Sequence, residues 1–324
     1  MVDDSVLAEK DTLLEKLKNM KTEIKKRIKG YEEEIDLSLI AVAALGHVLY
    51  TGFPGLAKTL LAKTVAEVSG CGFNRIQLTP DLTPSDIRGT EIWRPNNQSF
   101  ELYPGPIFTN IVLADEINRT PPKTQSAFLD AMQEKVVTIG NRTLSLPNPF
   151  MVFATRNPIE QEGIYPLPEA QLDRFLFEIL FPYPTEEDEI EIAKQGNDDP
   201  VPVDKVWDPE GLVALGKFVS QNVTADENVC AYIARFVRET RSYDPNIIEL
   251  GASPRASQKF VAASKAHAFV VRHDTQTTPD DADAVARHIL MPRLIVNPLN
   301  FHESDWGGLI DGIKQKARAY HIRS

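Results

Sequence analysis

The chain has 324 residues, more than a single hydrophobic core usually organises, so we expect two packed units. Its 42% hydrophobic and 25% charged residues are typical of a folded globular protein and exclude a disordered or fibrous one. The net charge of −11 disfavours a protein that follows nucleic-acid phosphates, because such a protein needs a surplus of Lys and Arg on one face.

The apolar stretches and the first residues of the chain predict a cytoplasmic protein without a membrane span. The longest mostly apolar stretch, Leu37 to Tyr50, is shorter than the roughly 20 residues that cross a bilayer, and residues 1–10 lack the apolar core of a secretory signal. The two cysteines, Cys71 and Cys230, predict neither a disulfide framework nor a Cys-x-x-Cys metal pair. The six His residues show no spacing suited to a transition metal.

Residues 1–30 are predicted to form an N-terminal helical segment. Over residues 5–29, Leu, Ile and Val alternate with Lys and Glu at helical spacing, and Gly30 suits the C-terminal cap of a helix. The charges of this helix fit either a solvated face or a binding arm. We interpret them as a solvated face, which is their commoner use.

Residues 31–183 are predicted to form an α/β domain in which strands alternate with helices. A mostly apolar helix at 35–45 precedes a short buried strand and a Gly-rich loop, and a second helix follows at 59–68. Strands that are apolar throughout are typical of a parallel sheet with helices on both faces. The expected strands are 47–51, 75–78, 111–114 and 150–155.

Two short hairpins interrupt this repeat. One spans residues 91–102 and turns at 96–99, and the other spans 136–146 and turns at Gly140 and Asn141. We expect both hairpins to be insertions on the α/β frame.

A break between domains is expected after Phe181, where a Pro-rich turn precedes an acidic run over residues 186–191. Residues 184–324 are expected to form a smaller lid domain that contains helices only. Two helix starts are signalled by a capping side chain before Pro at the first helical position. They are Ser253 with Pro254 and Thr278 with Pro279.

The loop from Gly52 to Thr59 nearly matches a phosphate-binding pattern, in which backbone N–H groups and a helix N-terminus face an anion. Lys58 would reach the β and γ phosphates of a nucleotide, and the Thr59 hydroxyl would lie on Mg²⁺. Ala57 stands where the generic pattern has Gly, so the loop alone could also be an ordinary strand-to-helix turn. The predicted nucleotide-binding residues here are Gly52, Pro54, Gly55, Leu56, Ala57, Lys58, Thr59 and Leu60.

Two acids end the apolar strand at 111–114, where the carboxyl end of a parallel strand presents side chains to a bound ligand. Asp115 would hold Mg²⁺, and Glu116 would orient or deprotonate the attacking water, since phosphoryl transfer depends on positioning. Alternatively, the two acids cap the helix that follows. The presence of Lys58 and Thr59 upstream favours the metal site.

Three further side chains are candidates for the same site. Asn157 follows another apolar strand and could hold the lytic water, or it could be a turn residue before Pro158. Arg174 precedes another expected apolar strand. It could stabilise the transferring phosphoryl group, although the residues alone favour a salt bridge to Asp173 or another nearby acid. Arg255 begins a lid helix and could be carried to the nucleotide by lid closure, or it could be a surface residue.

Together these motifs resemble the MoxR family of AAA+ ATPases over about residues 24–300. The resemblance rests on GHVLYTGFPGLAKT from Gly46, LADEINRTPPKTQSAFLDAMQE from Leu113, FATRNPIEQEGIYPLPEAQLDRF from Phe153 and GASPRA from Gly251. The order and separation of these segments are also those of the family. The fold that the resemblance implies is a P-loop NTPase sheet followed by an all-α lid.

The resemblance also implies a role for each candidate residue. It assigns Walker A to Gly52–Thr59, Walker B to Asp115 and Glu116, sensor 1 to Asn157, an arginine finger to Arg174 and sensor 2 to Arg255. Ala57 is common at its position in the family.

Two departures from the family pattern lie close to these motifs. The segment near the adenine would be Gly30 and Tyr31, with Tyr31 in place of a common Gln, and Arg156 stands where the family generally has Gln.

The two hairpins resemble the helix-2 insert and the pre-sensor-1 hairpin of the clade that contains magnesium chelatases, where they face the pore of a ring. Trp93, Phe100 and the turn at Gly140 would then meet a substrate. The alternative is that the aromatic rings only pack on the hairpin itself.

The resemblance predicts an ATPase that uses ATP and Mg²⁺ and assembles as a hexameric ring, with Arg174 acting on the neighbouring subunit's nucleotide. Hydrolysis would drive chaperone-like maturation of client proteins, such as metal or cofactor insertion, often with a partner that carries a von Willebrand factor A domain. Two alternatives remain open at this point: a nucleic-acid motor, which the acidic balance disfavours, and a nucleotide-gated scaffold with little turnover, which intact Lys58, Asp115 and Glu116 disfavour.

Overall fold

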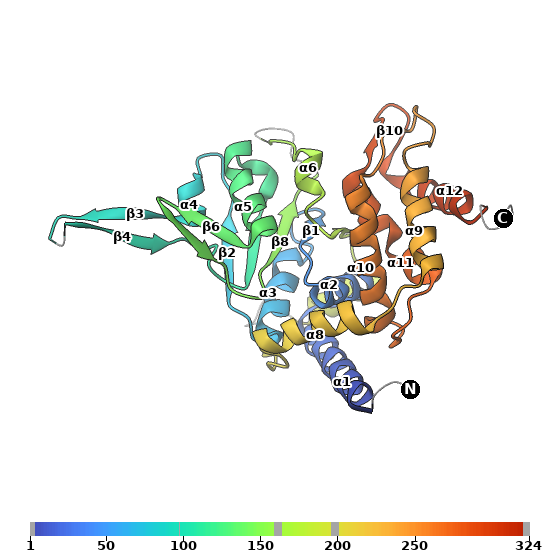
Figure 1. The fold of residues 1–324 in the computed structure, drawn as a ribbon, viewed down its shortest axis with the longest axis horizontal. Coiled ribbons are helices and arrows are strands. Elements are labelled where there is room, and N and C mark those ends of the chain that lie inside the picture. Colours follow the sequence, from blue (N-terminus) through green and yellow to red (C-terminus); the bar gives the residue numbers. More distant parts are fainter. Residues whose placement is uncertain (1–3, 97, 159–163, 196–200, 320–324) are drawn as a thin grey trace.

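The computed structural model describes residues 4–96, 98–158, 164–195 and 201–319. A sheet with its flanking helices and two hairpins forms one side of the molecule, and a group of helices forms the other (Figure 1). The predicted turn residue at 97 and the segment at 159–163, inside one of the family-like motifs, lie outside the described residues. Within the described ranges, no helix combines the length and apolarity that crossing a membrane requires.

Two helices precede the sheet. Helix α1 spans Asp4–Arg27 and α2 spans Glu32–Ala43. Gly30 links them with a φ of 65°, in the left-handed region that glycine adopts without strain. The apolar stripe of α1 is buried, and its charged face is left to solvent, as predicted for an amphipathic helix. The buried stripe comprises Leu13, Leu17, Met20 and Ile24.

The central sheet has five parallel strands in the order β2-β5-β8-β1-β9. The four strands predicted by range are present, and so is the apolar strand that was expected after Arg174, which is β9. The bounds are β1 Val48–Thr51, β2 Phe73–Gln77, β5 Ile111–Asp115, β8 Met151–Arg156 and β9 Phe177–Leu180. The predicted parallel sheet is therefore confirmed.

Alternate side chains of the sheet enter two separate cores, because successive residues of a strand point to opposite faces. Ile111 and Leu113 of β5 join the core that contains α3, whereas Val112 and Ala114 join the core that contains α5. Helix α3 spans Lys58–Val68, and α5 spans Pro122–Glu134. Helices thus cover both faces, as the apolar strands predicted.

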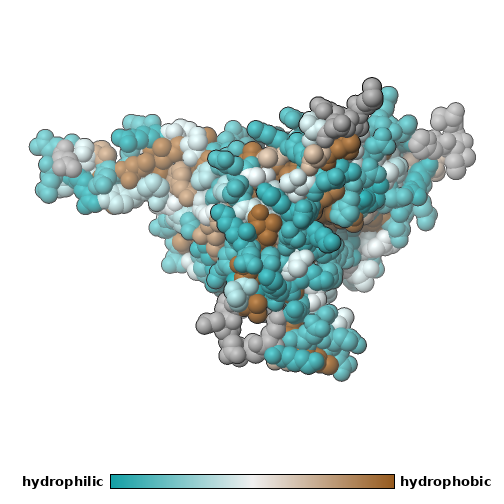
Figure 2. All heavy atoms as spheres, turned by 90° about the horizontal axis from the view of Figure 1, so that it is seen from below, coloured by the Kyte–Doolittle hydropathy of each residue, from teal (hydrophilic) through white to brown (hydrophobic). Residues whose placement is uncertain are grey.

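Both hairpins form as antiparallel pairs. Strands β3 (Gly89–Arg94) and β4 (Ser99–Pro104) follow the short helix α4 (Pro84–Arg88), and β6 (Val136–Ile139) pairs with β7 (Arg142–Ser145). The β3–β4 hairpin is an arm that projects from the α/β body (Figure 1), and hydrophobic atoms lie on its surface among polar ones (Figure 2).

The C-terminal part is mainly helical, but the prediction that it contains helices only was wrong. A two-stranded antiparallel sheet joins β10 (Ile248–Leu250) to β11 (Ile295–Val296). The main helices are α8 Pro209–Asn222, α9 Glu227–Glu239, α10 Pro254–Val270, α11 Pro279–Leu290 and α12 Trp306–Ala319. Two shorter elements belong to the α/β part: the 3-10 turn η1 (Ile117–Arg119) and α6 (Glu169–Leu172). The shorter elements after β9 are α7 Glu186–Gln195 and the 3-10 turns η2 Met291–Arg293 and η3 Glu303–Asp305.

Both predicted lid-helix starts are confirmed, since α10 begins at Pro254 and α11 begins at Pro279. Of these two helices, α11 has a capping box, in which Thr278 and Asp281 satisfy each other's backbone N–H groups. The capping side chain predicted for α10 was wrong, because the Ser253 side chain forms no capping hydrogen bond.

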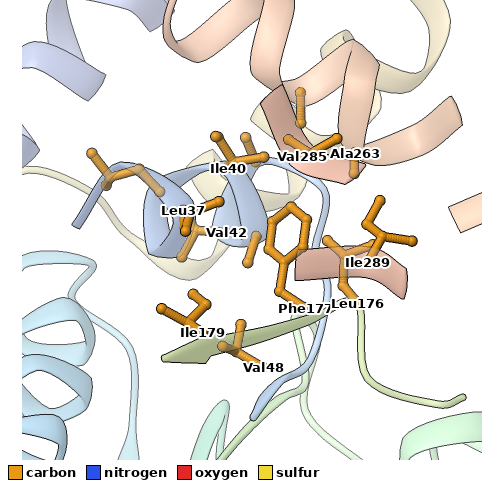
Figure 3. Close-up of a cluster of buried hydrophobic side chains, with 14 of the residues drawn as sticks. Leu37, Ile40, Val42, Val48, Leu176, Phe177, Ile179, Ala263, Val285 and Ile289 are labelled. Atoms are coloured by element: carbon orange, nitrogen blue, oxygen red, sulfur yellow. The ribbon is translucent and has the colours of Figure 1, made fainter. Parts of the chain in front are cut away.

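Helix α2 connects the sheet to the lid. It packs against α8 and α10, while α11 packs against β9. Figure 3 shows apolar side chains from these elements meeting in one cluster between the sheet edge and the lid helices. The labelled members are Leu37, Ile40, Val42, Val48, Leu176, Phe177, Ile179, Ala263, Val285 and Ile289. Because this core is continuous, the lid is held against the sheet edge next to the loop that follows β1.

Candidate nucleotide-binding site

The loop between β1 and α3 has the backbone that an anion cradle requires. Gly55 has a φ of 86° and Ala57 a φ of 55°, both in the left-handed region, so the chain turns sharply before α3 begins at Lys58. A Cβ at Gly52 would lie 2.9 Å from Phe181, so this position requires glycine. The first turn of α3 carries no acidic side chain, so no carboxylate of this turn competes with a bound anion for the positive N-terminal end of the helix dipole.

This loop lines a cavity of about 470 Å³ at the carboxyl ends of β5 and β8. All eight predicted loop residues are present in its lining, together with Asp115, Glu116 and Asn157. Three further residues of this lining were given no role there by the sequence: Lys63, Thr155 and Arg156.

Lys58 folds back over its own loop. Its Nζ donates hydrogen bonds to the carbonyls of Gly52, at 2.6 Å, and Phe53, at 2.5 Å. Burial lowers the pKa of Lys58, and the carboxylates of Asp115 and Glu116 oppose that shift. The ammonium group is therefore held inside the cradle, on the side that faces the two acids.

Asp115 is buried and already bonded. The Thr155 hydroxyl donates to its Oδ1 at 2.6 Å, and Arg75 lies on its Oδ2 at 2.9 Å from Nε and 2.6 Å from Nη2. Neither partner was predicted from the sequence. They reach Asp115 through the parallel register of β2, β5 and β8, so only the order of the strands could have indicated them.

Glu116 has a strained backbone, with φ 59° and ψ 54°, in a region that non-glycine residues seldom adopt. Its N–H donates to the Thr155 hydroxyl at 2.8 Å, which holds the strained peptide in place. Its Oε2 accepts from Gln77 at 3.0 Å and pairs with Arg119 at 3.2 Å. Thr155 therefore positions both acids at once.

Arg156 belongs to a buried network beside Asn157. Its Nε donates to the Thr51 hydroxyl at 2.9 Å, and its guanidinium pairs with Glu178. The Thr51 hydroxyl also donates to Glu178, at 2.6 Å. Glu178 is almost fully buried, so this ion pair links the ends of β8, β1 and β9 next to the cavity.

The donors in the cavity fit a magnesium ion. Mg²⁺ prefers oxygen ligands and is usually bound by one or two carboxylates together with substrate phosphates. The hydroxyl of Thr59 and the carboxylate of Asp115 line the same cavity, and the cation next to Asp115 is the half-exposed Arg75. An oxygen donor pair of this kind beside a phosphate cradle matches the metal predicted from the sequence.

Arg174 and Arg255 do not line this cavity. Both line a second cavity, of about 460 Å³, together with Gln133 and Lys259. Arg174 Nε is 3.4 Å from Gln133 Oε1. The sequence favoured an ion pair between Arg174 and Asp173 or another nearby acid. Asp173 is not that partner, because its carboxylate pairs with Arg293, 2.9 Å away and 120 residues distant in sequence.

Gly30 and Tyr31 are likewise outside the described lining of the phosphate-loop cavity. The Tyr31 ring packs on Phe181 with centroids 5.2 Å apart, and its hydroxyl donates to the Pro182 carbonyl at 3.2 Å. A separate cavity of about 330 Å³ adjoins Gly52 on that side of the loop. A contact between Tyr31 and adenine stays a prediction.

The chain matches two family models. Residues 47–177 match the family described as ATPase family associated with various cellular activities (AAA), and residues 245–306 match the AAA lid domain.

Known relatives cover most of the chain. Chaperone MoxR1 of Mycobacterium tuberculosis is 42% identical over 281 residues, which are 85% of this chain and 74% of that protein. The uncharacterized protein YeaC of Bacillus subtilis is 45% identical over 264 residues, 81% of each chain. A crystal structure from Cytophaga hutchinsonii, provisionally assigned as an ATPase, superposes with a TM-score of 0.87 at 38% identity and covers 97% of both chains.

Proposed function

Because this chain belongs to the MoxR family of AAA+ ATPases, we propose that it hydrolyses ATP in the cavity beside Lys58 to mature or remodel partner proteins. ATP hydrolysis and membership of a chaperone family follow from the relatives. The roles of individual residues, the assembly and the clients are our proposal. We place its action in the cytoplasm.

The observation that carries the proposal is the convergence of a phosphate cradle and two acids in one cavity. The main-chain N–H groups of Gly52–Thr59 and the Lys58 ammonium would bind the β and γ phosphates of ATP. Thr59 and Asp115 would hold Mg²⁺, which neutralises charge on the phosphates when bound.

The attacking water would be oriented by Glu116 and Asn157 at the same sheet edge. Gln77 and Arg119 both bond to Oε2 of Glu116, so Oε1 would orient the water without displacing either partner. The Thr155 hydroxyl, which accepts from the Glu116 N–H, would keep the backbone of Glu116 in place meanwhile.

Arg174 and Arg255 would act on the nucleotide of a neighbouring subunit. They share a cavity separate from the one that contains Lys58, which supports a role in trans for both. We propose a ring assembly, with a hexamer as the expected state. In that arrangement a cradle of one subunit and the arginines of the next complete each site.

The projecting β3–β4 hairpin is our candidate for client contact. Trp93 and Phe100 pack edge to face with centroids 5.1 Å apart, yet their exposed fractions are 48% and 57%. Ring packing and exposure therefore coexist, and the arm presents an apolar surface that a client segment could cover. On the family resemblance alone, we extend the proposal to a partner with a von Willebrand factor A domain.

Binding and turnover of two variants test the proposal. Lys58→Ala should abolish binding of Mg²⁺-ATP, whereas Arg174→Ala should retain binding and lose phosphate release, because Lys58 contacts ground-state phosphates and Arg174 acts in the transition state. Calorimetric titration and a steady-state phosphate assay measure the two quantities. Lys217→Ala, on the outer surface of α8, is the control and should change neither. Full hydrolysis by Arg174→Ala would refute its assignment.

A further inference from the structure

We propose that Lys259 is a positioning residue that connects the lid to Arg174. Lys259 donates a hydrogen bond to the main-chain carbonyl of Arg174 and thereby orients the Arg174 side chain, whose guanidinium extends toward the neighbouring subunit. The lid of one subunit thus controls hydrolysis in the next. This inference rests on the proposed action of Arg174 in trans.

The contact is direct. Lys259 lies on lid helix α10, and its Nζ donates to the carbonyl of Arg174 at 2.6 Å and to that of Phe175 at 3.2 Å. Both acceptors lie just before β9, on the α/β side of the molecule. A lid side chain thus bonds to the peptide that carries the proposed finger.

Lys259 is buried among groups that do not offset the cost of removing its ammonium group from water, so its contribution to stability does not by itself explain a lysine at this position. Within the described ranges it forms no ion pair, and its acceptors are neutral carbonyls. Burial lowers the pKa of Lys259 to about 7, assisted by the charges of Arg293, Arg255 and Arg174 and opposed by Asp173. A neutral side chain of similar length would avoid that desolvation, so a positioning role explains the lysine better than packing does.

A second lid cation holds the same segment from another element. Arg293 of η2 pairs with the Asp173 carboxylate at 2.9 Å and donates to the main-chain carbonyls of Asp173 and Leu176, each at 3.3 Å. Arg293 therefore fixes the segment as a whole, including the residue before Arg174. Among the described lid residues, Lys259 is the one that bonds to the carbonyl of Arg174 itself.

Arg174 is consequently positioned from two sides. Its Nε faces Gln133 of α5 at 3.4 Å, and its carbonyl is bonded by α10. Arg255 is one helical turn before Lys259, so the two side chains lie on the same face of α10 and line the same cavity. A shift of α10 relative to α5 would therefore move Arg255 and redirect Arg174 together.

Mixed assemblies of full-length subunits test this inference. Glu116→Gln subunits have an inactive site of their own but intact arginines for the neighbour, and Arg174→Ala subunits are the reverse. Mixing these two should restore phosphate release. Lys259→Met subunits should behave like Arg174→Ala: at least ten-fold lower kcat when alone, an unchanged dissociation constant for Mg²⁺-ATP, and restored turnover when mixed with Glu116→Gln.

The decisive arm is a double variant. Subunits with both Glu116→Gln and Lys259→Met should fail to restore Arg174→Ala subunits. Lys259→Arg, which keeps a cationic donor, should retain most of the wild-type kcat. Lys265→Met is the matched control, because Lys265 is on the same helix and also donates to a carbonyl, that of Ser220 on α8. It should behave as wild type in every mixture.

Each remaining outcome decides against a specific claim. Two outcomes would show that Lys259 does not act through Arg174. In one, the double variant restores phosphate release by Arg174→Ala subunits to the same extent as the single Glu116→Gln variant. In the other, Glu116→Gln subunits fail to restore phosphate release by Lys259→Met subunits. If Arg174→Ala and Glu116→Gln fail to complement each other, the proposed trans action falls and this inference falls with it. Should Lys259→Met fail to fold, Lys259→Gln, which keeps an uncharged donor, replaces it.

Discussion

Replacing Thr155 by Val should damage both the stability of the protein and its catalysis, while leaving the shape of the side chain nearly unchanged. The Thr155 hydroxyl is buried, donates to Asp115 Oδ1 at 2.6 Å and accepts from the N–H of Glu116 at 2.8 Å. Valine removes both hydrogen bonds at once. The site would then lose a group that bonds directly to both the proposed metal ligand and the proposed water-orienting acid.

The magnitude follows from the two lost bonds. A hydrogen bond to a charged group contributes about 1.5–3 kcal/mol, and leaving a buried N–H unpaired costs about 1–3 kcal/mol. Arg75 remains on Asp115, and the adjacent cavity admits water, so the lower end of each range applies. We expect Thr155→Val to lower the free energy of unfolding by about 2.5 kcal/mol.

Urea denaturation followed by circular dichroism measures this change, and steady-state phosphate release measures the effect on turnover. We expect kcat to fall at least ten-fold while Mg²⁺-ATP binding persists, since Lys58 and the loop are untouched. Thr138→Val is the control, because Thr138 is an exposed strand residue whose hydroxyl contacts the hydroxyl of Thr143, also exposed, at 3.2 Å. If the two variants unfold with equal free energies, the role assigned to the Thr155 hydroxyl is wrong.

Three further predictions concern other residues. Burial lowers the pKa of His47 from 6.5 to about 3, so between pH 7 and pH 5 the unfolded chain binds a proton at His47 and the folded chain does not. Lowering the pH from 7 to 5 should therefore reduce the free energy of unfolding by about 2 kcal/mol through His47. Urea titrations of wild type and His47→Gln at both pH values measure this, and equal pH dependence would contradict it. Arg75→Gln should lower the Mg²⁺ concentration needed for half-maximal ATP binding several-fold, because it removes the positive charge that lies next to the Asp115 carboxylate. Calorimetric titration tests the direction of this change, with Arg88→Gln as the control. Ala57→Gly should raise the free energy of unfolding by up to about 1 kcal/mol, because releasing the left-handed strain at φ 55° slightly outweighs the added freedom of the unfolded chain. A clear loss of stability on urea denaturation would show that Ala57 is not strained.

The sequence predicted the sheet and its two faces because each strand carries a local signal, an apolar run bounded by turn residues. The small β10–β11 sheet carries no such signal. Its strands have three and two residues and lie far apart in the chain, so their pairing depends on tertiary contacts. For the same reason the lid was predicted to be wholly helical.

The candidate site was predictable where its residues follow strands or a glycine-rich loop. Lys58, Asp115 and Asn157 meet because the carboxyl ends of parallel strands share one sheet edge. Arg75 and Thr155 were missed, because their contacts with Asp115 depend on which strands are neighbours, and the sequence does not state that order.

The partner of Asp173 was missed for a related reason. Adjacency in sequence suggested Arg174, but the acceptor geometry at Asp173 is satisfied by Arg293 from the lid. Pairing of this kind between distant elements is set by packing, which periodicity and turn signals do not encode.

A structure of the assembled Glu116→Gln variant with Mg²⁺ and ATP tests the central claim most directly. Our account predicts the triphosphate along Gly52–Thr59 with Lys58 on its β and γ phosphates, Mg²⁺ between Thr59 and Asp115, and Arg174 of the adjoining subunit at the γ phosphate. A triphosphate bound away from this loop, or Arg174 reaching the nucleotide of its own subunit, would contradict it.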